Sequence, residues 1–250
     1  MSSKESSQTM EIIDDVDKYD KSFNILILGD CNVGKTSLID VVKGNKFKET
    51  YNPTVGFDFF SLCVKIYDKI IKLQIWDISG QETYRSLIND FLKKTSLIIL
   101  VYDITNIKSF ENIDTWLKDI KIITEEAKII LVGNKSDLAG KRVVTEEKGK
   151  EKCESNHLTE FIECSSKNGI NVKEIFINTA KILYDDLNNM NLENEINLDS
   201  KEDKNASSSN NFEDDFLIRE SFKIKKKSCP CCHSNCCWTC YENIKNLKIN

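Results

Sequence analysis

One stretch of eight residues, from Gly29 to Thr36, constrains the fold of this chain more than any other. It reads G-D-C-N-V-G-K-T, fits the pattern G-x-x-x-x-G-K-[ST], and directly follows the apolar run 23–28. Glycines let the backbone curl until its N–H groups converge on phosphate oxygens, and a helix that begins there adds a favourable potential. The pattern therefore predicts a phosphate-binding loop between a strand and a helix, with Lys35 on the β- and γ-phosphates and Thr36 on Mg²⁺.

The composition is that of a globular protein. The chain has 250 residues, of which 40% are hydrophobic, and this is enough to bury a full core in one or two domains. Its formal net charge of −5 argues against nucleic acid as a partner. No apolar run approaches the length of about 18 residues that indicates a membrane-spanning helix. Residues 1–21 lack the apolar centre of a signal peptide, so we expect a cytoplasmic protein.

Strands and helices alternate along the body of the chain. Residues 59–66 and 70–76 have the pattern of a β-hairpin, and the continuous apolar run 97–102 is typical of a strand buried on both faces. Alternating elements predict an α/β fold, with a mostly parallel six-stranded sheet flanked by helices and with ligands at the carboxyl ends of the strands. Asp77 follows the hairpin and is placed to hold Mg²⁺ through water. Further strands are expected at 128–132 and 161–163, and helices at 35–42, 109–123, 145–155 and 171–187.

Five segments, in their order and spacing, resemble the nucleotide-binding elements of Ras-superfamily small GTPases. They are the phosphate loop, the turn-rich stretch 47–56, D-I-S-G-Q-E at 77–82, N-K-S-D at 134–137 and C-S-S-K at 164–167. The resemblance covers residues 22–190 and implies a P-loop small G domain that binds GTP and GDP with Mg²⁺ and hydrolyses GTP to GDP and phosphate. Three stretches further resemble signatures of the Rab family: V-G-F-D-F at 55–59, K-L-Q-I-W at 72–76 and L-V-Y-D-I-T at 100–105.

The resemblance assigns the recognition of the base to the second half of the domain. Asn134 and Asp137 match N-K-x-D, in which the aspartate accepts two hydrogen bonds from guanine. Adenine presents the wrong donor pattern, so we expect ATP to be rejected. Lys135 is expected along the face of the base, Phe47 at its edge, and residues 165–167 to supply an N–H group to the guanine oxygen.

Hydrolysis is assigned to the two switch segments. Thr54 matches the threonine of switch I that ligates Mg²⁺ and senses the γ-phosphate, and Gly80 and Gln81 match the switch II residues that bind that phosphate and orient the attacking water. Positioning alone gives slow turnover, which an arginine supplied by an activating protein raises on the order of 10³–10⁵-fold. The residues expected to act in catalysis are Gln81, Lys35 and Thr54, and those expected to hold Mg²⁺ are Thr36, Thr54 and Asp77. Those expected to contact the nucleotide are Asp30, Cys31, Asn32, Val33, Gly34, Lys35, Thr36, Ser37, Phe47, Tyr51, Thr54, Gly80, Asn134, Lys135, Asp137, Ser165, Ser166 and Lys167.

Two departures from the family pattern bear on function. Cys31 stands where a small residue usually lies near the γ-phosphate, and its bulk is expected to slow hydrolysis modestly. Residues 91–95, F-L-K-K-T, replace a stretch that carries tyrosine and glycine in the family, which predicts an unusual choice of effector or activator.

The organisation expected from the sequence has four parts. Residues 1–21 form a flexible N-terminal extension, 22–190 the small GTPase domain, 191–222 an acidic disordered linker, and 223–250 a basic, cysteine-rich tail. Rabs typically end in two geranylgeranylated cysteines, whereas here residues 238–250 follow the last cysteine pair.

Three explanations of the tail remain open: palmitoylation, which does not need a chain end, prenylation of a natural chain that stops at a cysteine pair, and zinc. The zinc ligands would be Cys229, Cys232, Cys237 and Cys240, with His233 as a substitute. Cys31, Cys63, Cys153 and Cys164 are scattered through the body and are expected to remain thiols. Lipid is expected at Cys231, Cys232, Cys236 and Cys237.

Two functions follow from these features. The first is a GTP-hydrolysing switch of vesicle traffic, peripheral on the cytosolic face of an endomembrane of the early secretory pathway or Golgi. Its expected partners are an exchange factor, a GTPase-activating protein, effectors at the switches, a GDP-dissociation inhibitor (GDI), the prenylation machinery and, through the tail, the membrane surface. The alternative is a soluble scaffold that hydrolyses GTP slowly and binds a metal or a protein through its tail.

Overall fold

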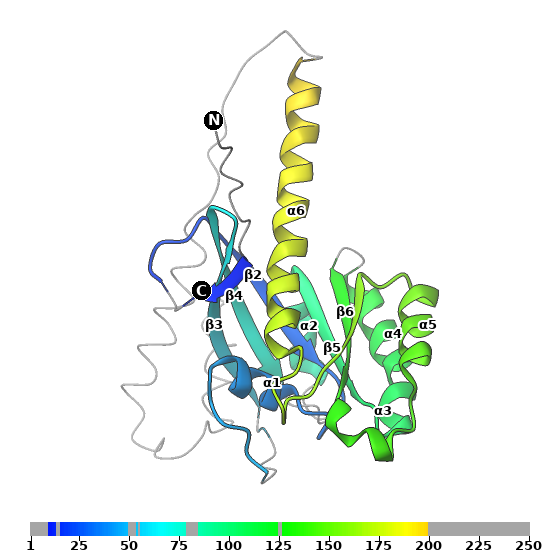
Figure 1. The fold of residues 1–250 in the computed structure, drawn as a ribbon. Coiled ribbons are helices and arrows are strands. Elements are labelled where there is room, and N and C mark those ends of the chain that lie inside the picture. Colours follow the sequence, from blue (N-terminus) through cyan, green and yellow to red (C-terminus); the bar gives the residue numbers. More distant parts are fainter. Residues whose placement is uncertain are drawn as a thin grey trace, which may run out of the picture. The chain divides into compact units, whose positions relative to one another are not determined.

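A computed structural model describes residues 10–13, 16–49, 54, 56–78, 85–124 and 127–199. Its centre is a seven-stranded sheet with the strand order β1-β3-β4-β2-β5-β6-β7 (Figure 1). The β1–β3 and β3–β4 pairs are antiparallel, and the other neighbours are parallel. The strands are β1 (Met10–Ile13), β2 (Lys21–Leu28), β3 (Phe57–Ile66), β4 (Lys69–Ile78), β5 (Leu97–Asp103), β6 (Lys128–Asn134) and β7 (Glu160–Glu163).

Helices cover both faces of the sheet, because successive strand residues point to opposite sides. Ile25 and Ile27 of β2 pack with α1 and the first turns of α6, whereas Leu26 and Leu28 pack with α2, α3, α4 and α5. All four side chains are buried. The helices are α1 (Lys35–Val42), α2 (Arg85–Leu92), α3 (Ile107–Glu111), α4 (Ile113–Ile123), the 3-10 helix η2 (Ser136–Lys141), α5 (Glu146–Ser155) and α6 (Val172–Asp199).

The predicted α/β fold with a mostly parallel, helix-covered sheet is confirmed, and the structure differs from the prediction in detail. In the part of the chain that the structure describes, the sheet has seven strands and not six, because β1 adds a strand from within the stretch expected to be a flexible extension. The helix expected at 109–123 is two helices that meet at Asn112. The last helix continues to Asp199 and so enters the stretch expected to be a disordered linker, and α2 was not predicted. Among the described helices, none combines the length and the apolar character needed to span a membrane.

The parallel strands bring four functional segments to one edge of the sheet. β2 runs into residues 29–34 and then α1, and the register places Asp77 of β4 beside Ile27 of β2. Farther along, Asp103 of β5 is the partner of Asn134 of β6. The carboxyl ends of β2, β4, β5 and β6 therefore lie together beside the loop before α1 (Figure 1).

Candidate functional site

The loop between β2 and α1 needs both of its glycines. Gly29 has a φ of +136°, and a Cβ there would lie 2.1 Å from the carbonyl oxygen of Val101 in β5. Gly34 has a φ of +98°, and its Cβ would lie 2.3 Å from Nδ2 of Asn134. Only a residue without a side chain fits these positions, so the glycines let the loop curl tightly against β5 and β6.

Lys35 lies folded over this loop. Its Nζ donates to the carbonyl oxygens of Gly29 and Asp30, both at 2.8 Å, and the side chain is buried. Burial lowers the pKa of Lys35, and the negative charge of Asp77 opposes that shift. The carbonyls hold the ammonium group at the start of α1, where phosphate oxygens can take their place as its partners.

Three oxygen-bearing side chains meet beside the loop. Thr36 Oγ1 lies 2.5 Å from Asp77 Oδ2 and 2.8 Å from Thr54 Oγ1. The other carboxylate oxygen of Asp77, Oδ1, is buried and has no hydrogen-bond partner among the described residues. Burial raises the pKa of Asp77, although the hydrogen bond from Thr36 and the charge of Lys35 act in the opposite direction. A buried acceptor without a donor, next to two hydroxyl oxygens, fits the oxygen ligands that Mg²⁺ prefers.

Asn134 joins the phosphate loop to residues 164–169, which we call the base loop. Its Nδ2 donates to the carbonyl oxygen of Val33 at 2.9 Å. Its Oδ1 accepts from the backbone N–H and the hydroxyl of Ser166, both at 3.1 Å, and from the backbone N–H of Lys135 at 2.8 Å. Because Asn134 is buried and both ends of its amide are used, it fixes the two loops relative to each other.

Lys135 makes a second connection to the phosphate loop. Its Nζ lies 2.7 Å from the carbonyl oxygen of Asn32 and 2.7 Å from Oδ2 of Asp103. Asp103 is buried, and its Oδ1 accepts from the backbone N–H and the hydroxyl of Thr105. Sequence reasoning did not find the role of Asp103. The sequence carried a signal for it, since Asp103 is the last residue of a buried strand and Asp77 lies one residue before the end of another.

Asp137 is oriented by its neighbour in the base loop. Ser165 Oγ donates to Asp137 Oδ1 at 2.6 Å and accepts from the backbone N–H of Asn168 at 3.1 Å. The carboxylate is therefore held in one direction before any ligand arrives, which suits it to accept hydrogen bonds from a planar base.

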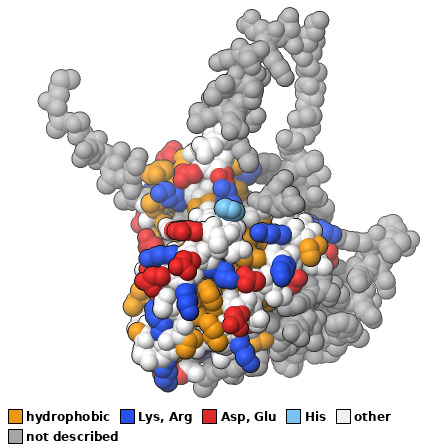
Figure 2. Space-filling model, turned by 90° about the vertical axis from the view of Figure 1, so that its right-hand side faces the viewer, with side chains coloured by type: hydrophobic (Ala, Val, Ile, Leu, Met, Phe, Trp, Pro, Cys, Tyr) orange, Lys and Arg blue, Asp and Glu red, His pale blue; other side chains and the backbone are white. Residues whose placement is uncertain are grey.

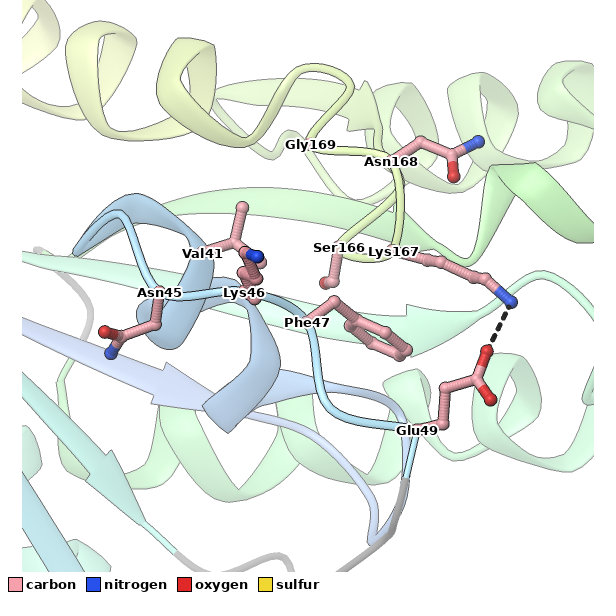
Figure 3. Close-up of a pocket in the computed structure, with 9 residues that line it drawn as sticks. All are labelled: Val41, Asn45, Lys46, Phe47, Glu49, Ser166, Lys167, Asn168 and Gly169. Atoms are coloured by element: carbon pink, nitrogen blue, oxygen red, sulfur yellow. Dashed lines mark hydrogen bonds and ion pairs between the residues drawn. The ribbon is translucent and has the colours of Figure 1, made fainter.

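Phe47 and Lys167 line a groove of about 490 Å³ between the end of α1 and the base loop (Figure 3). The ring of Phe47 lies beside the base loop, and Lys167 Nζ reaches across to Glu49 Oε1 at 3.1 Å. Both charged side chains are well exposed, so this ion pair contributes little to stability. It nevertheless connects the segment after α1 with the base loop, and Glu49 was not among the predicted residues.

The remaining predicted residues fall into two groups. Cys31 and Asn32 are exposed on the loop, and Asn32 has a left-handed φ of 62°. Ser37 is half-buried in the first turn of α1, and the carboxylate of Asp30 is directed to α4. Outside the described residues lie Tyr51, Gly80, Gln81 and the tail cysteines Cys231, Cys232, Cys236 and Cys237, together with the candidate zinc ligands Cys229, Cys240 and His233.

The described geometry joins a loop suited to phosphate, a group of oxygen atoms suited to Mg²⁺ and a loop suited to a base. A family model described as "Ras family" matches residues 24–185, which include all three parts. The match spans more than half of the chain. The chain therefore belongs to the Ras family, whose members are small GTPases that bind GTP and GDP with Mg²⁺ and act as switches.

Proposed function

We propose that this Ras-family protein is a Rab-type switch, which hydrolyses GTP and regulates vesicle traffic on the cytosolic face of an endomembrane, in the early secretory pathway or at the Golgi. The observation that carries the proposal is the connection through Asn134, which ties the phosphate loop to the base loop with hydrogen bonds of 2.9 to 3.1 Å. The three Rab-like stretches at 55–59, 72–76 and 100–105 support the narrower assignment.

Asp137 is the proposed guanine reader. Guanine offers an N1–H and an exocyclic amine on one edge, and a carboxylate accepts from both. Adenine has neither an N1–H nor an amine on the neighbouring carbon, so ATP would leave the oriented carboxylate without both partners and be rejected. Lys135 lies along the base in this proposal, Phe47 at its edge, and the N–H groups of residues 165–167 reach the guanine oxygen.

The phosphate end of the site is proposed to work by positioning. The Lys35 ammonium group and the backbone N–H groups of residues 30–37 bind the β- and γ-phosphates. Thr36, Thr54 and Asp77 would hold Mg²⁺, which neutralises phosphate charge when bound. Gly80 and Gln81, from their match to switch II, are proposed to bind the γ-phosphate and orient the attacking water. The hydrolysis is intrinsically slow, and an activating protein accelerates it.

An aromatic cluster supports partner binding near the switches. The Phe59 ring lies 4.6 Å from that of Trp76, which lies 4.9 Å from Phe91, and Phe57 packs against both Trp76 and Phe91. Phe59 is 38% exposed, a high value for an aromatic side chain. Phe57 follows the switch segment 47–56 directly and Trp76 precedes the segment 77–82 directly, so an effector, exchange factor or activator that binds the switches would also meet this cluster.

The tail is proposed to bring the domain to the membrane. Residues 223–227 supply lysines for an anionic surface, and the cysteine pairs supply attachment points for acyl or prenyl groups, which together anchor more firmly than one lipid chain. GDI and the prenylation machinery would then be further partners.

The charges on the face of α4 and α5 are of both signs (Figure 2). They include the Lys152–Asp114 and Lys150–Glu146 ion pairs. A mixed surface of this kind does not favour binding of a nucleic acid.

Single-turnover hydrolysis tests the catalytic part of the proposal. Purified full-length protein loaded with GTP should produce GDP and phosphate slowly, and Gln81→Leu should slow this step by at least about tenfold, because the side chain that orients the water is lost. Loading with ATP should fail under the same conditions. Equal rates for the wild type and Gln81→Leu would favour the slow scaffold instead, and efficient ATP loading would refute the base assignment.

A further inference from the structure

The side chain of Asp30 points out of the phosphate loop toward α4. Its Oδ2 accepts from Nδ2 of Asn112 at 2.7 Å, and its Oδ1 accepts from Nε1 of Trp116 at 2.9 Å. Each carboxylate oxygen therefore has a donor on the same helical segment. Asp30 was expected to contact the nucleotide. Because both of its carboxylate oxygens are bonded to donors at α4, only its backbone remains for that contact.

The two donors lie at the start of α4, whose apolar side packs in the hydrophobic core. Asn112 is the residue at which α3 ends and α4 begins, and Trp116 follows one turn later on the same side of α4. Trp116 is only 4% exposed and packs in the hydrophobic cluster between the sheet and α4. A loop residue bonded to these side chains is thus fixed to the core.

The backbone of Asp30 reaches the centre of the site. Its carbonyl oxygen accepts from Lys35 Nζ at 2.8 Å, beside the carbonyl of Gly29 at the same distance. Because the carboxylate and this carbonyl belong to one residue, fixing the first restricts the direction of the second. The hydrogen bonds to α4 therefore help to set where the Lys35 ammonium group lies.

We propose that Asp30 is a positioning residue, whose anchor to Asn112 and Trp116 holds the phosphate loop in its binding form, slows nucleotide release and places Lys35 for hydrolysis. This inference rests on the nucleotide site proposed above. It assigns to α4 a role in nucleotide retention, although no side chain of α4 is needed to touch the nucleotide.

The test measures release of a fluorescent GDP analogue and single-turnover hydrolysis in the full-length protein. Asp30→Ala removes two charge-assisted hydrogen bonds and should speed release by roughly tenfold and slow hydrolysis. Trp116→Phe and Asn112→Ala each remove one donor and should speed release by roughly threefold. These two variants also preserve the test if Asp30→Ala does not fold.

The matched control is Asp114→Asn, on the same helix. Asp114 accepts from Lys152 of α5 at 2.8 and 2.9 Å, and its carboxylate faces α5. If α4 only stabilised the fold, Asp114→Asn would release GDP as fast as the three anchor variants. The anchor instead predicts that Asp114→Asn releases GDP within about twofold of the wild-type rate. Combining Asp30→Ala with Trp116→Phe should add nothing to Asp30→Ala, because both remove the same contact.

Two results would overturn the anchor. One is release from Asp30→Ala, Trp116→Phe and Asn112→Ala at the wild-type rate, and the other is equal acceleration by Asp114→Asn. If the wild type itself retained no labelled GDP, the nucleotide site would fail and the anchor with it. Wild-type retention with unchanged variants would refute the anchor alone.

Discussion

At the scale of single residues, Asp77 shows how a functional side chain opposes the stability of its own fold. The carboxylate is 1% exposed, and burial raises its pKa above the ordinary value of 3.8 despite the nearby charge of Lys35. A raised pKa in the folded state means that the protonated form is favoured by folding. The associated stability is complete below the unfolded pKa and is lost as the pH rises through the folded pKa.

We therefore predict that Asp77→Asn stabilises the protein when Mg²⁺ and nucleotide are removed. Asparagine keeps the size and can still accept from Thr36, but it carries no charge, so the thermal midpoint at neutral pH should rise by a few degrees. The advantage over the wild type should shrink as the pH falls through the raised pKa of folded Asp77, because the wild-type carboxyl group then becomes neutral as well.

With Mg²⁺ and GDP present, the wild type should have the higher thermal midpoint of the two. A ligand that binds only the folded state stabilises it more when it binds more tightly, and Asp77→Asn loses a proposed Mg²⁺ ligand. Thermal melts with chelator and with Mg²⁺–GDP measure both effects. A midpoint for Asp77→Asn below that of the wild type in chelator would contradict the electrostatic argument, and equal stabilisation by Mg²⁺–GDP would contradict the metal assignment.

At the scale of secondary-structure elements, β1 is the clearest addition to the expected sheet. Its backbone pairs with Cys63–Ile66 of β3, and its Met10 and Ile12 pack against the cluster under α1 and α6. β3 and β4 pair here at the start of β4, whereas the nucleotide site lies at the carboxyl end of β4. This strand should therefore affect stability and not nucleotide binding.

Deleting residues 1–13 tests this separation. Two partly buried apolar side chains are worth about 2 kcal/mol together, and such a loss should lower the thermal midpoint by about 4–8 °C in a domain of this size. GDP release should not change. Ile12→Ser should reproduce part of the loss and Glu11→Ser almost none, because Ile12 packs against the cluster whereas Glu11 is exposed. Faster GDP release after the deletion would show that β1 acts on the site.

Features that depend on neighbouring residues could be predicted from the sequence, whereas contacts between distant elements could not. The phosphate loop, Asp77 and the N-K-x-D segment carry local signals, namely glycines at fixed spacing and polar residues at the ends of apolar strands. The anchor of Asp30 joins residues 82 positions apart and needed the structure. The helix boundary at Asn112 was missed because the apolar spacing continues through it. β1 was missed because four residues in an acidic stretch give too short a pattern.

At the scale of the whole molecule, the nucleotide site and the proposed membrane anchor are separate in the chain. The site lies within the matched residues 24–185, inside a compact unit that ends at Glu195, whereas the cysteine pairs come after residue 230. A change that abolishes membrane attachment should therefore leave nucleotide binding intact, and a change in the nucleotide site should leave membrane attachment intact. A scaffold with a metal-binding tail would also have a nucleotide-binding domain separate from its tail. The two functions are therefore distinguished by whether the tail carries lipid groups or a metal.

We predict that a chain ending at Glu195 keeps the thermal midpoint and the GDP release rate of the full chain but no longer sediments with membranes when expressed in its own cells. Replacing Cys231, Cys232, Cys236 and Cys237 by serine should release the full chain in the same way, since the lipids on these sulfurs supply most of the membrane affinity. The intact mass of the wild type then identifies the modification, because prenyl and acyl groups add different masses. A full-length, unmodified mass together with unchanged solubility in both variants would reject the membrane anchor and leave the scaffold.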